Sequence, residues 1–594
     1  MQKVSEAWKA AHNERLLPEN MIEIKIAVGD PESIADAKAE SNDADELANT
    51  EKIAEGLILT PTRYFTPELN CWLLGGDGDV YPDAKPTDTG FISEALSGEN
   101  GTFSDPPVIS IRFSRVFEKL IPGITITWAE AYNEFAHRFR VTAYSGTEIV
   151  AEAEYSDNRE LVSACEFPIA RYDRIDITVL AWCQPYHRAR ISEVFIGMQK
   201  SYRKSNIVSY NNNIRISPLG DKLPKYEIEF EIDNSDGSYD TGNPNGMTRY
   251  LMERQPVNVR YGMKVGGETE SIRGGRYYLT EWKSPQNGIT ATFKARDALE
   301  YMRGIYHRGI FNPSGESLYK LAENVLLDAN LPLTGYGEHP WRLDASLKNI
   351  KTTAALPMVS RAECLQLIAN AGRCVMTVDR TGNIVIEPKK TNVEDYTVSN
   401  FNSYAKPEIE LSKPLSRAEV DVYSYFVASE SKELYNGIRA ITGTETLLVE
   451  YAQSAVEVSA QVSGGELVSA VYYTHACELT ITANGDVTII VNGKELDVST
   501  SLYSIDTGED GESEELDNPL ITSTETAKAA AEYMVSVLKK RRTFSMDWRA
   551  DTRLDAGDII RLENEYASET AYVTELKYSF TGAFRASGKA RSTR

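Results

Sequence analysis

This chain lacks the short motifs that carry the commonest enzyme chemistries. Its 594 residues contain no HExxH, GxSxG, GxxxxGKS/T or GxGxxG segment, so metalloprotease, serine hydrolase and nucleotide-binding functions have no support. Paired carboxylates such as Asp555 and Asp558 could serve glycoside chemistry, but their position in a turn favours a structural role. We therefore predict a protein that is not an enzyme and has no catalytic residues.

Cysteine and histidine are also scarce. The six cysteines include no CxxC pair and no Cys/His cluster with zinc spacing, so we expect buried free thiols, no metal and no cofactor. The acidic segment 506–517 has the length of an EF-hand loop. However, Gly508 occupies its third position, where calcium needs an oxygen ligand. A solvated acidic loop is therefore the favoured interpretation.

Long apolar runs and an excess of positive charge are absent as well. No run approaches the roughly 18 apolar residues of a membrane-spanning helix, and the N-terminus lacks the apolar core of a signal peptide. We therefore expect no membrane-spanning segment and synthesis in the cytoplasm. The net charge of -24 argues against broad binding to phosphate backbones, so we predict no sequence-specific nucleic-acid binding.

What the chain does contain is β-structure. Its length predicts about three to five domains. The 32 tyrosines favour strands, and many short strand patterns are separated by Gly, Pro and Asn. The predicted fold is mainly β with α+β parts: an N-terminal β-sandwich, two related small β-barrels and a small α/β domain.

One segment occurs twice in the chain. YLTEWKSPQNGITATFKAR at 278–296 aligns with YVTELKYSFTGAFRASGKAR at 572–591, with one inserted residue before the shared KAR. Each segment predicts a hairpin that breaks at its glycine, where a positive φ costs little. The residues matched without a gap are Tyr278, Thr280, Glu281, Lys283 and Gly288 with Tyr572, Thr574, Glu575, Lys577 and Gly582. The sequence therefore predicts that one small β-domain is present in two copies.

The N-terminal third predicts a helical arm followed by a sandwich. Residues 1–21 carry a weak helical stripe, and residues 22–200 begin with an alternating strand and continue with regularly spaced short strands. The stretches PGITITW, YDRIDITV and RARISEVFIG resemble the galactose-binding, discoidin-type jelly rolls that serve as carbohydrate modules. This resemblance implies a jelly roll that could bind a host surface glycan.

A sugar site of this kind would combine an aromatic platform with polar groups at one end of the sandwich. The candidate residues are Trp128, Tyr132, Trp182, Tyr186, His187 and Arg188. The alternative interpretation makes Trp128 and Trp182 core aromatics and Arg188 a surface charge.

The middle of the chain predicts a smaller α/β domain at 312–392, after a first barrel at 214–311. Apolar residues at helical spacing predict a helix near Leu318, and a second helix begins at the capping box Ser360–Glu363 and ends at Gly372. CVMTVD and IVIEP then flank the tight turn RTGN. The run SRAECLQLIANAGRCVMTVDRTGNIVIEP resembles the internal domain of phage baseplate hub proteins and the N-terminal regions of tail-associated lysins.

The C-terminal third predicts a second barrel with an insertion. RAEVDVYSYFV at 417–427 opens this barrel within 393–520, and in the β-rich insertion ELTITANGDVTIIVNG predicts a further hairpin. Residues 521–594 then supply a helix capped at Thr522–Glu525 and the closing strands. WRADTRLDAGDIIRLEN resembles the closing domain of the same hub family.

The hub resemblance covers roughly residues 214–594 and carries a functional expectation. It implies a homotrimer in the virion tail, made in the host bacterium, whose six related barrels form a pseudo-sixfold ring that joins the tail tube to the tip and gates DNA passage. Hexameric distal tail or tail-tube proteins and a tape-measure protein would be its partners. Two alternatives stay open, namely a glycan-binding tail adhesin for host attachment and a cell-wall-degrading tail enzyme.

Overall fold

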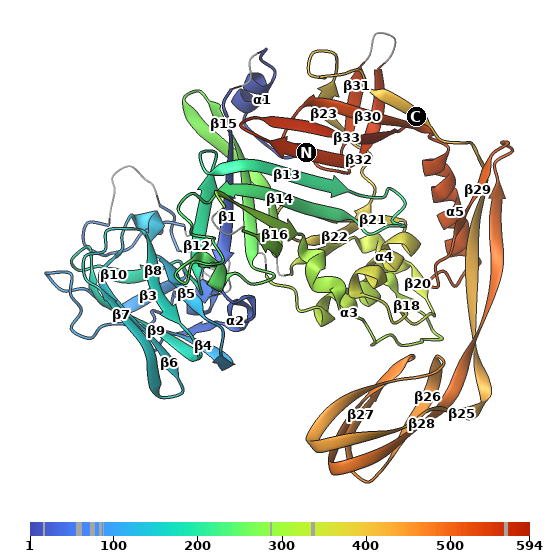
Figure 1. Ribbon diagram of the computed structural model, residues 1–594, viewed down its shortest axis with the longest axis horizontal. Helices are drawn as coiled ribbons and strands as arrows, with labels where there is room; N and C mark the ends of the chain where they lie inside the picture. The colour runs from blue at the N-terminus through green and yellow to red at the C-terminus, as the bar shows by residue number, and fades with distance from the viewer. Residues whose placement is uncertain are drawn as a thin grey trace.

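A computed structural model shows a mainly β protein, as predicted (Figure 1). None of the helices among its described residues is long and apolar enough to cross a membrane. The turn of the first repeated hairpin, at 285–287, lies outside these residues. The structure describes residues 1–15, 18–54, 62–71, 78–81, 86, 88–284, 288–333, 339–563 and 568–594.

A 13-stranded sheet, here called the central sheet, joins both ends of the chain. Its main path runs β12 (Met198–Arg203), β1 (Asn20–Val28), β15 (Pro256–Val265), β16 (Glu268–Lys283), β17 (Thr290–Arg296), β14 (Lys225–Asp233), β13 (Ile207–Arg215), β32 (Ser568–Phe580), β33 (Phe584–Ser592), β30 (Arg542–Arg549) and β24 (Glu408–Leu411). From β32 the sheet also continues through β31 (Ile559–Glu563) to β23 (Val393–Val398). One hydrophobic core lies against strands of both repeated regions.

The central sheet contains one four-stranded unit twice. The first copy has the spatial order β14-β17-β16-β15, and the second has the order β30-β33-β32-β31. If the four strands of each copy are numbered along the chain, both copies have the spatial order 1-4-3-2. Neighbouring strands within each copy are antiparallel. Strand β13 lies between the copies and pairs with β14 on one side and β32 on the other. The two predicted barrels are therefore adjacent parts of one shared sheet.

The strand that begins near Met21 belongs to the central sheet, although its sequence placed it at the start of the sandwich. Within β1, Ile24 lies opposite Tyr202 of β12 and Val259 of β15. Alternating burial reveals which face of a strand is covered, but it does not reveal which sheet supplies the neighbours. The sandwich therefore begins after β1 and ends before β12.

The sandwich is built from antiparallel strands of several small sheets. One sheet has the order β2 (Lys38–Glu40), β4 (Val108–Phe117), β9 (Tyr172–Trp182), β6 (Ala136–Ser145), β7 (Glu148–Tyr155). The others are β11 (Glu193–Phe195), β5 (Ile121–Thr127), β8 (Val162–Ile169), and the pair β10 (Arg188–Ile191), β3 (Phe91–Leu96). A separate core, including Ile109, Ile124 and Phe139, draws on these sheets. The sandwich therefore has its own hydrophobic interior.

The helices lie mostly beside the central sheet (Figure 1). A short α1 (Glu6–His12) forms the N-terminal arm. In the α/β part, α3 (Leu318–Asp328) packs against α4 (Arg361–Ala371). Helix α4 packs against β21 (Cys374–Val378), which forms an antiparallel hairpin with β22 (Ile384–Pro388). The capping box of Ser360 and Glu363 forms as predicted, because both reciprocal hydrogen bonds are present. Helix α5 (Thr524–Leu538) is capped by Ser523, one residue beyond the predicted cap.

A long two-stranded arm projects from the body (Figure 1). It pairs β25 (Leu415–Glu450) with β28 (Ala476–Asp506) along nearly their whole lengths, and β26 (Ala455–Ser463) and β27 (Glu466–Tyr472) widen its tip around a small core. Two predictions were therefore wrong. The segment 417–427 is the base of this arm rather than a strand of the second barrel, and β28 runs straight through Asn484 and Gly485 without a turn.

Candidate functional site

The two tryptophans proposed as a sugar platform are core residues. Trp128 is 0% exposed and Trp182 is 2% exposed. Their rings meet edge to face at 6.1 Å. Each indole N–H donates inside the sandwich, Trp128 to Ser163 Oγ at 2.7 Å and Trp182 to Glu134 Oε2 at 2.7 Å. Neither ring offers a solvent-facing surface on which a sugar could stack, because packing and hydrogen bonding already use both.

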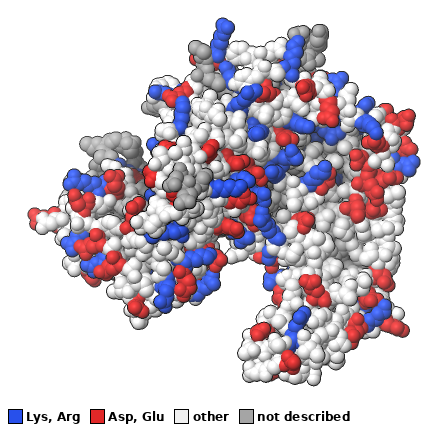
Figure 2. Space-filling view, viewed as in Figure 1, with Lys and Arg blue, Asp and Glu red and all other residues white. Residues whose placement is uncertain are grey.

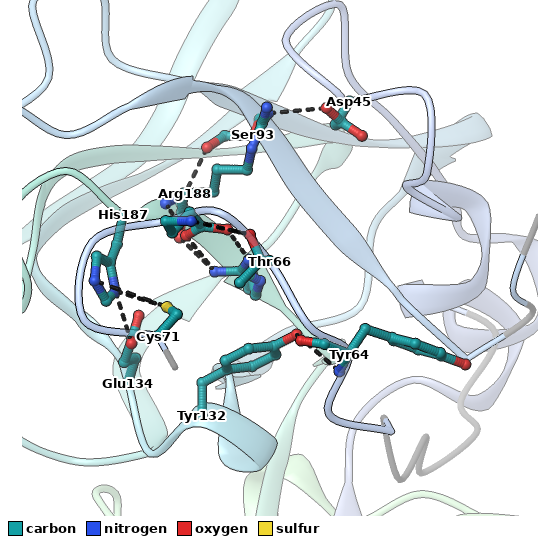
Figure 3. Close-up of polar contacts among 12 residues, drawn as sticks. Asp45, Tyr64, Thr66, Cys71, Ser93, Tyr132, Glu134, His187 and Arg188 are labelled. Carbon is teal, nitrogen blue, oxygen red and sulfur yellow. Dashed lines mark hydrogen bonds and ion pairs between the residues drawn. The ribbon is translucent and has the colours of Figure 1, made fainter. Parts of the chain in front are cut away.

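His187 is buried within a polar cluster, next to Cys71 and Glu134 (Figure 3). Its Nδ1 lies 2.8 Å from Glu134 Oε1, and its Nε2 faces the carbonyl oxygen of Leu69. Cys71 Sγ lies 3.6 Å from Nδ1. The carboxylate of Glu134 thus contacts both the indole N–H of Trp182 and the imidazole of His187. The cluster is therefore connected to the hydrophobic core through Trp182. The imidazole is held on both ring nitrogens and has little freedom to turn towards a ligand.

An ion pair forms the second half of this cluster. The guanidinium of Arg190 meets the carboxylate of Glu68, and Arg188 N–H donates to the same carboxylate at 2.8 Å. The Arg190 guanidinium also lies over the ring of Tyr132, at 4.3 Å from its centroid. Burial acts to raise the pKa of Glu68, but the hydrogen bonds and charge of Arg190 outweigh burial and lower it. Glu68 is therefore a paired carboxylate.

Glu68, Cys71 and His187 bring three metal-ligand types together, with ligand atoms within 4.8 Å of one another. Zinc would need the thiolate form of Cys71. Burial, followed by the charges of Glu68 and Glu134, raises the pKa of this thiol to about 11, so the thiol holds its proton at neutral pH when no metal is bound. Glu68 and His187 are already engaged by protein groups, and their geometry fits a structural clamp.

The remaining candidates also make internal contacts. Tyr132 Oη donates to the carbonyl oxygen of Tyr64 at 2.9 Å. Arg188 Nη1 donates to the Ser93 carbonyl at 2.6 Å and pairs with Asp45 at 2.9 Å (Figure 3). Tyr186 is 43% exposed. The structure thus brings Tyr132, His187 and Arg188 together around residues 64–71, but it does not form an aromatic platform. Sequence spacing could not reveal this cluster, because Cys71 and His187 are 116 residues apart.

The repeated segments adopt the same bulged hairpin. In the first, Tyr278 pairs with Arg296, and a register shift then places Glu281 opposite Lys294. In the second, Tyr572 pairs with Arg591, and the same shift places Glu575 opposite Lys589. The skipped residue is a threonine in both copies. A β-bulge of this kind inserts one unpaired residue and sharpens the local twist of the strand.

Side chains at the bulge take matching roles in the two copies. Thr280 Oγ1 donates to the Lys294 carbonyl at 3.2 Å, and Thr574 Oγ1 donates to the Lys589 carbonyl at 3.2 Å. Tyr278 and Tyr572, which occupy equivalent positions in the two copies, are both buried. Lys283 and Lys577 are both exposed, and Gly288 and Gly582 each lie between the two strands of their hairpin. The residues that are identical in the two segments therefore form the same local structure.

No protein-family model matches the sequence, and no curated protein matches it. Solved structures do match. The 43 kDa tail protein of prophage MuSo2 from Shewanella oneidensis is 13% identical, with a TM-score of 0.38, over 66% of this chain and 95% of that chain. The tail protein from Neisseria meningitidis MC58 is 8% identical, with a TM-score of 0.37, over 66% and 93%. Prophage tail protein gp18 from Listeria monocytogenes EGD-e is 7% identical, with a TM-score of 0.37, over 67% and 92%.

Proposed function

We propose that this chain is a structural protein of a phage tail or phage-derived particle, and that it forms the trimeric hub of a baseplate. The observation that carries the proposal is the four-stranded unit present twice in one sheet with the same strand order and the same bulge. Three chains would supply six such units. A threefold ring of this kind could contact a sixfold tube through related surfaces, without separate adaptors.

The arrangement of the two units supports this proposal. Strand β13 joins them edge to edge, pairing Ile214 with Tyr226 on one side and with Leu576 on the other. The core beneath them is continuous. The two units therefore behave as one rigid body with two related surfaces, as a ring with alternating units requires. A hexameric tube or distal tail protein and a tape-measure protein would be the partners, and DNA would pass through the ring.

The carboxylates near the second copy have structural partners, which supports a role without catalysis. Asp551 pairs with Arg553, and Asp555 pairs with Arg380 from the β21–β22 hairpin. Asp558 receives the N-terminal ammonium of Met1 at 2.9 Å. Asp555 and Asp558 therefore hold distant parts of the chain together, whereas the Asp551 pair is local. Each of the three carboxylates is engaged by a cation rather than free as an acid or base.

The proposal is tested by the mass and symmetry of the purified protein. Native mass spectrometry and sedimentation velocity should give three chains of 66.2 kDa each. Averaged electron micrographs of the particle should show six similar densities around the ring. A stable monomer with turnover on peptidoglycan would instead support the enzyme alternative and would contradict the hub.

A further inference from the structure

An open cleft of about 970 Å³ lies between the sandwich and the central sheet. One wall is the outer face of β1, β15 and β16. The other wall includes α2 (Pro31–Asp36), β2 and β11, and residues 330–333 complete it. A cleft of this volume can accommodate a segment of several residues. The cleft is separate from the polar cluster of the sandwich, which lies in the sandwich interior.

The central-sheet wall of this cleft carries three arginines, Arg260, Arg273 and Arg276. Arg260 of β15 lies directly opposite Arg273 of β16, and Asn258, two residues before Arg260, lies opposite Arg276. Residues 273 and 276 would normally face opposite sides of a strand, because they are three apart. A bulge at Gly274 corrects this spacing and turns both arginines towards the cleft. The sheet therefore departs from regular pairing in a way that concentrates positive charge.

The charges that face this cleft remain positive in sum. Among the residues that the structure describes, six basic and three acidic residues line it. One of the basic residues, Arg380, is paired with Asp555, and one of the acidic residues, Glu40, is paired with Arg112. Burial raises the pKa of Glu193 to about 7, so this carboxyl carries only part of its negative charge at neutral pH.

The chain carries a matching acidic surface elsewhere. Residues 415–517 contain 19 Asp and Glu against 4 Lys and Arg, a net of -15 out of the total of -24. The densest part, Glu509–Asp517, holds six carboxylates in nine residues. It includes β29 (Glu512–Leu516), an edge strand with Glu512, Glu514 and Glu515 exposed. Figure 2 shows acidic side chains over the base of the arm and basic side chains near the centre of the same face.

We propose that the acidic segment Glu509–Asp517 of one chain docks in the basic cleft of a neighbouring chain. This docking rests on the proposed trimer. It identifies the two surfaces through which neighbouring chains of that trimer would contact each other. The sandwich and β29 lie on opposite sides of the molecule (Figure 1), so the contact joins two different surfaces. Such a head-to-tail contact closes into a ring when its rotation is one third of a turn. Charge complementarity then sets the direction of the ring.

The test reverses charge on each side of the proposed contact. R260E/R273E alters the cleft, and E514K/E515K alters the acidic segment. Each variant should raise the dissociation constant of the trimer at least 100-fold in sedimentation velocity, and the variant with all four changes should recover most of the lost affinity. R159E/R171E provides a control of equal charge change, because both arginines are exposed on the sandwich and lie outside the cleft. Thermal unfolding should confirm that all variants are folded.

The possible outcomes separate this docking from the hub proposal. A wild-type trimer that survives R260E/R273E would overturn the docking and leave the hub intact. Failure of the four-change variant to recover affinity would mean that another anion occupies the cleft, which also overturns the docking. A wild-type monomer would overturn the hub proposal and the docking together. The contact would be established by three results together. R260E/R273E and E514K/E515K each weaken the trimer, the variant with all four changes recovers trimer affinity, and R159E/R171E leaves that affinity unchanged.

Discussion

The two four-stranded copies agree in their hairpins and differ in what surrounds them. In the first copy, β15 pairs antiparallel with β1, and residues 234–255 connect its first two strands. In the second copy, β31 pairs parallel with β23, and only residues 550–558 make the same connection. The hairpin depends on local sequence, whereas its neighbours come from distant segments. The two copies therefore share the unit that folds locally and differ in the strands that pair with its edges.

The largest expected effect lies at a position where the copies carry opposite residue types. Phe293 is buried in the first copy, and the equivalent residue of the second copy is Gly588. F293A should cost about 3–5 kcal/mol of unfolding free energy, because it leaves a cavity in the core. Urea denaturation followed by tyrosine and tryptophan fluorescence would measure this loss. A cost below ~1 kcal/mol would show that the first copy does not depend on this packing.

Part of the pH dependence of stability should come from the first copy, at the residue just after its KAR segment. Burial raises the pKa of Asp297 to about 7, while the second copy has Ser592 there. Because the folded pKa lies above the unfolded value, stability is fully present below about pH 4 and decreases as pH rises towards 7. D297S should remove this decrease, which is about 4 kcal/mol at most. Thermal unfolding of both proteins between pH 4 and 8 would test this, and parallel profiles would contradict it.

Gly588 should resist any larger side chain. A Cβ at this position would lie 2.1 Å from the carbonyl oxygen of Glu575, at the bulge. G588A should therefore destabilise the protein by about 1–3 kcal/mol through overpacking. G582A is a useful comparison in the turn of the same hairpin, where a Cβ has open space but φ is +105°. A loss from G588A below about 0.5 kcal/mol would show that the close carbonyl does not limit position 588.

The smallest effect tests whether the two bulges are equivalent. T280V and T574V each remove one hydrogen bond to a carbonyl, with the same donor–acceptor distance of 3.2 Å. Each should cost about 0.5–1.5 kcal/mol, with the same value in both copies within error. The double variant should give the sum of the two losses if the copies are independent. A loss confined to one copy would show that only one bulge depends on its threonine.

Part of this fold could be predicted from the chain because its signals are local. The capping box of Ser360 and Glu363, the β21–β22 hairpin and the repeated hairpins all involve residues close in sequence. The arm was missed because Asn484 and Gly485 form a typical turn pair, yet β28 passes through them. Pairing with β25 on one side and β26 or β27 on the other holds that strand extended. Such long-range pairing can override local turn preference.

The candidate residues of the sandwich show the same division. Their residue types suited a sugar site, and only burial could assign Trp128 and Trp182 to the core. The cluster around His187 depends on Cys71 and Glu134, which approach from separate segments. No spacing rule in the chain predicts that meeting.

The sequence by itself determined the mainly β class, the duplicated hairpin and the capping box of α4, because alternation, turn glycines and capping side chains act over a few residues. Tertiary structure alone decided that the two copies share one sheet, that β1 joins this sheet, and that the arginines of β15 and β16 face one cleft. The physical reason is that strand pairing satisfies backbone hydrogen bonds across any sequence distance. The choice of partner therefore depends on the packing of the whole chain.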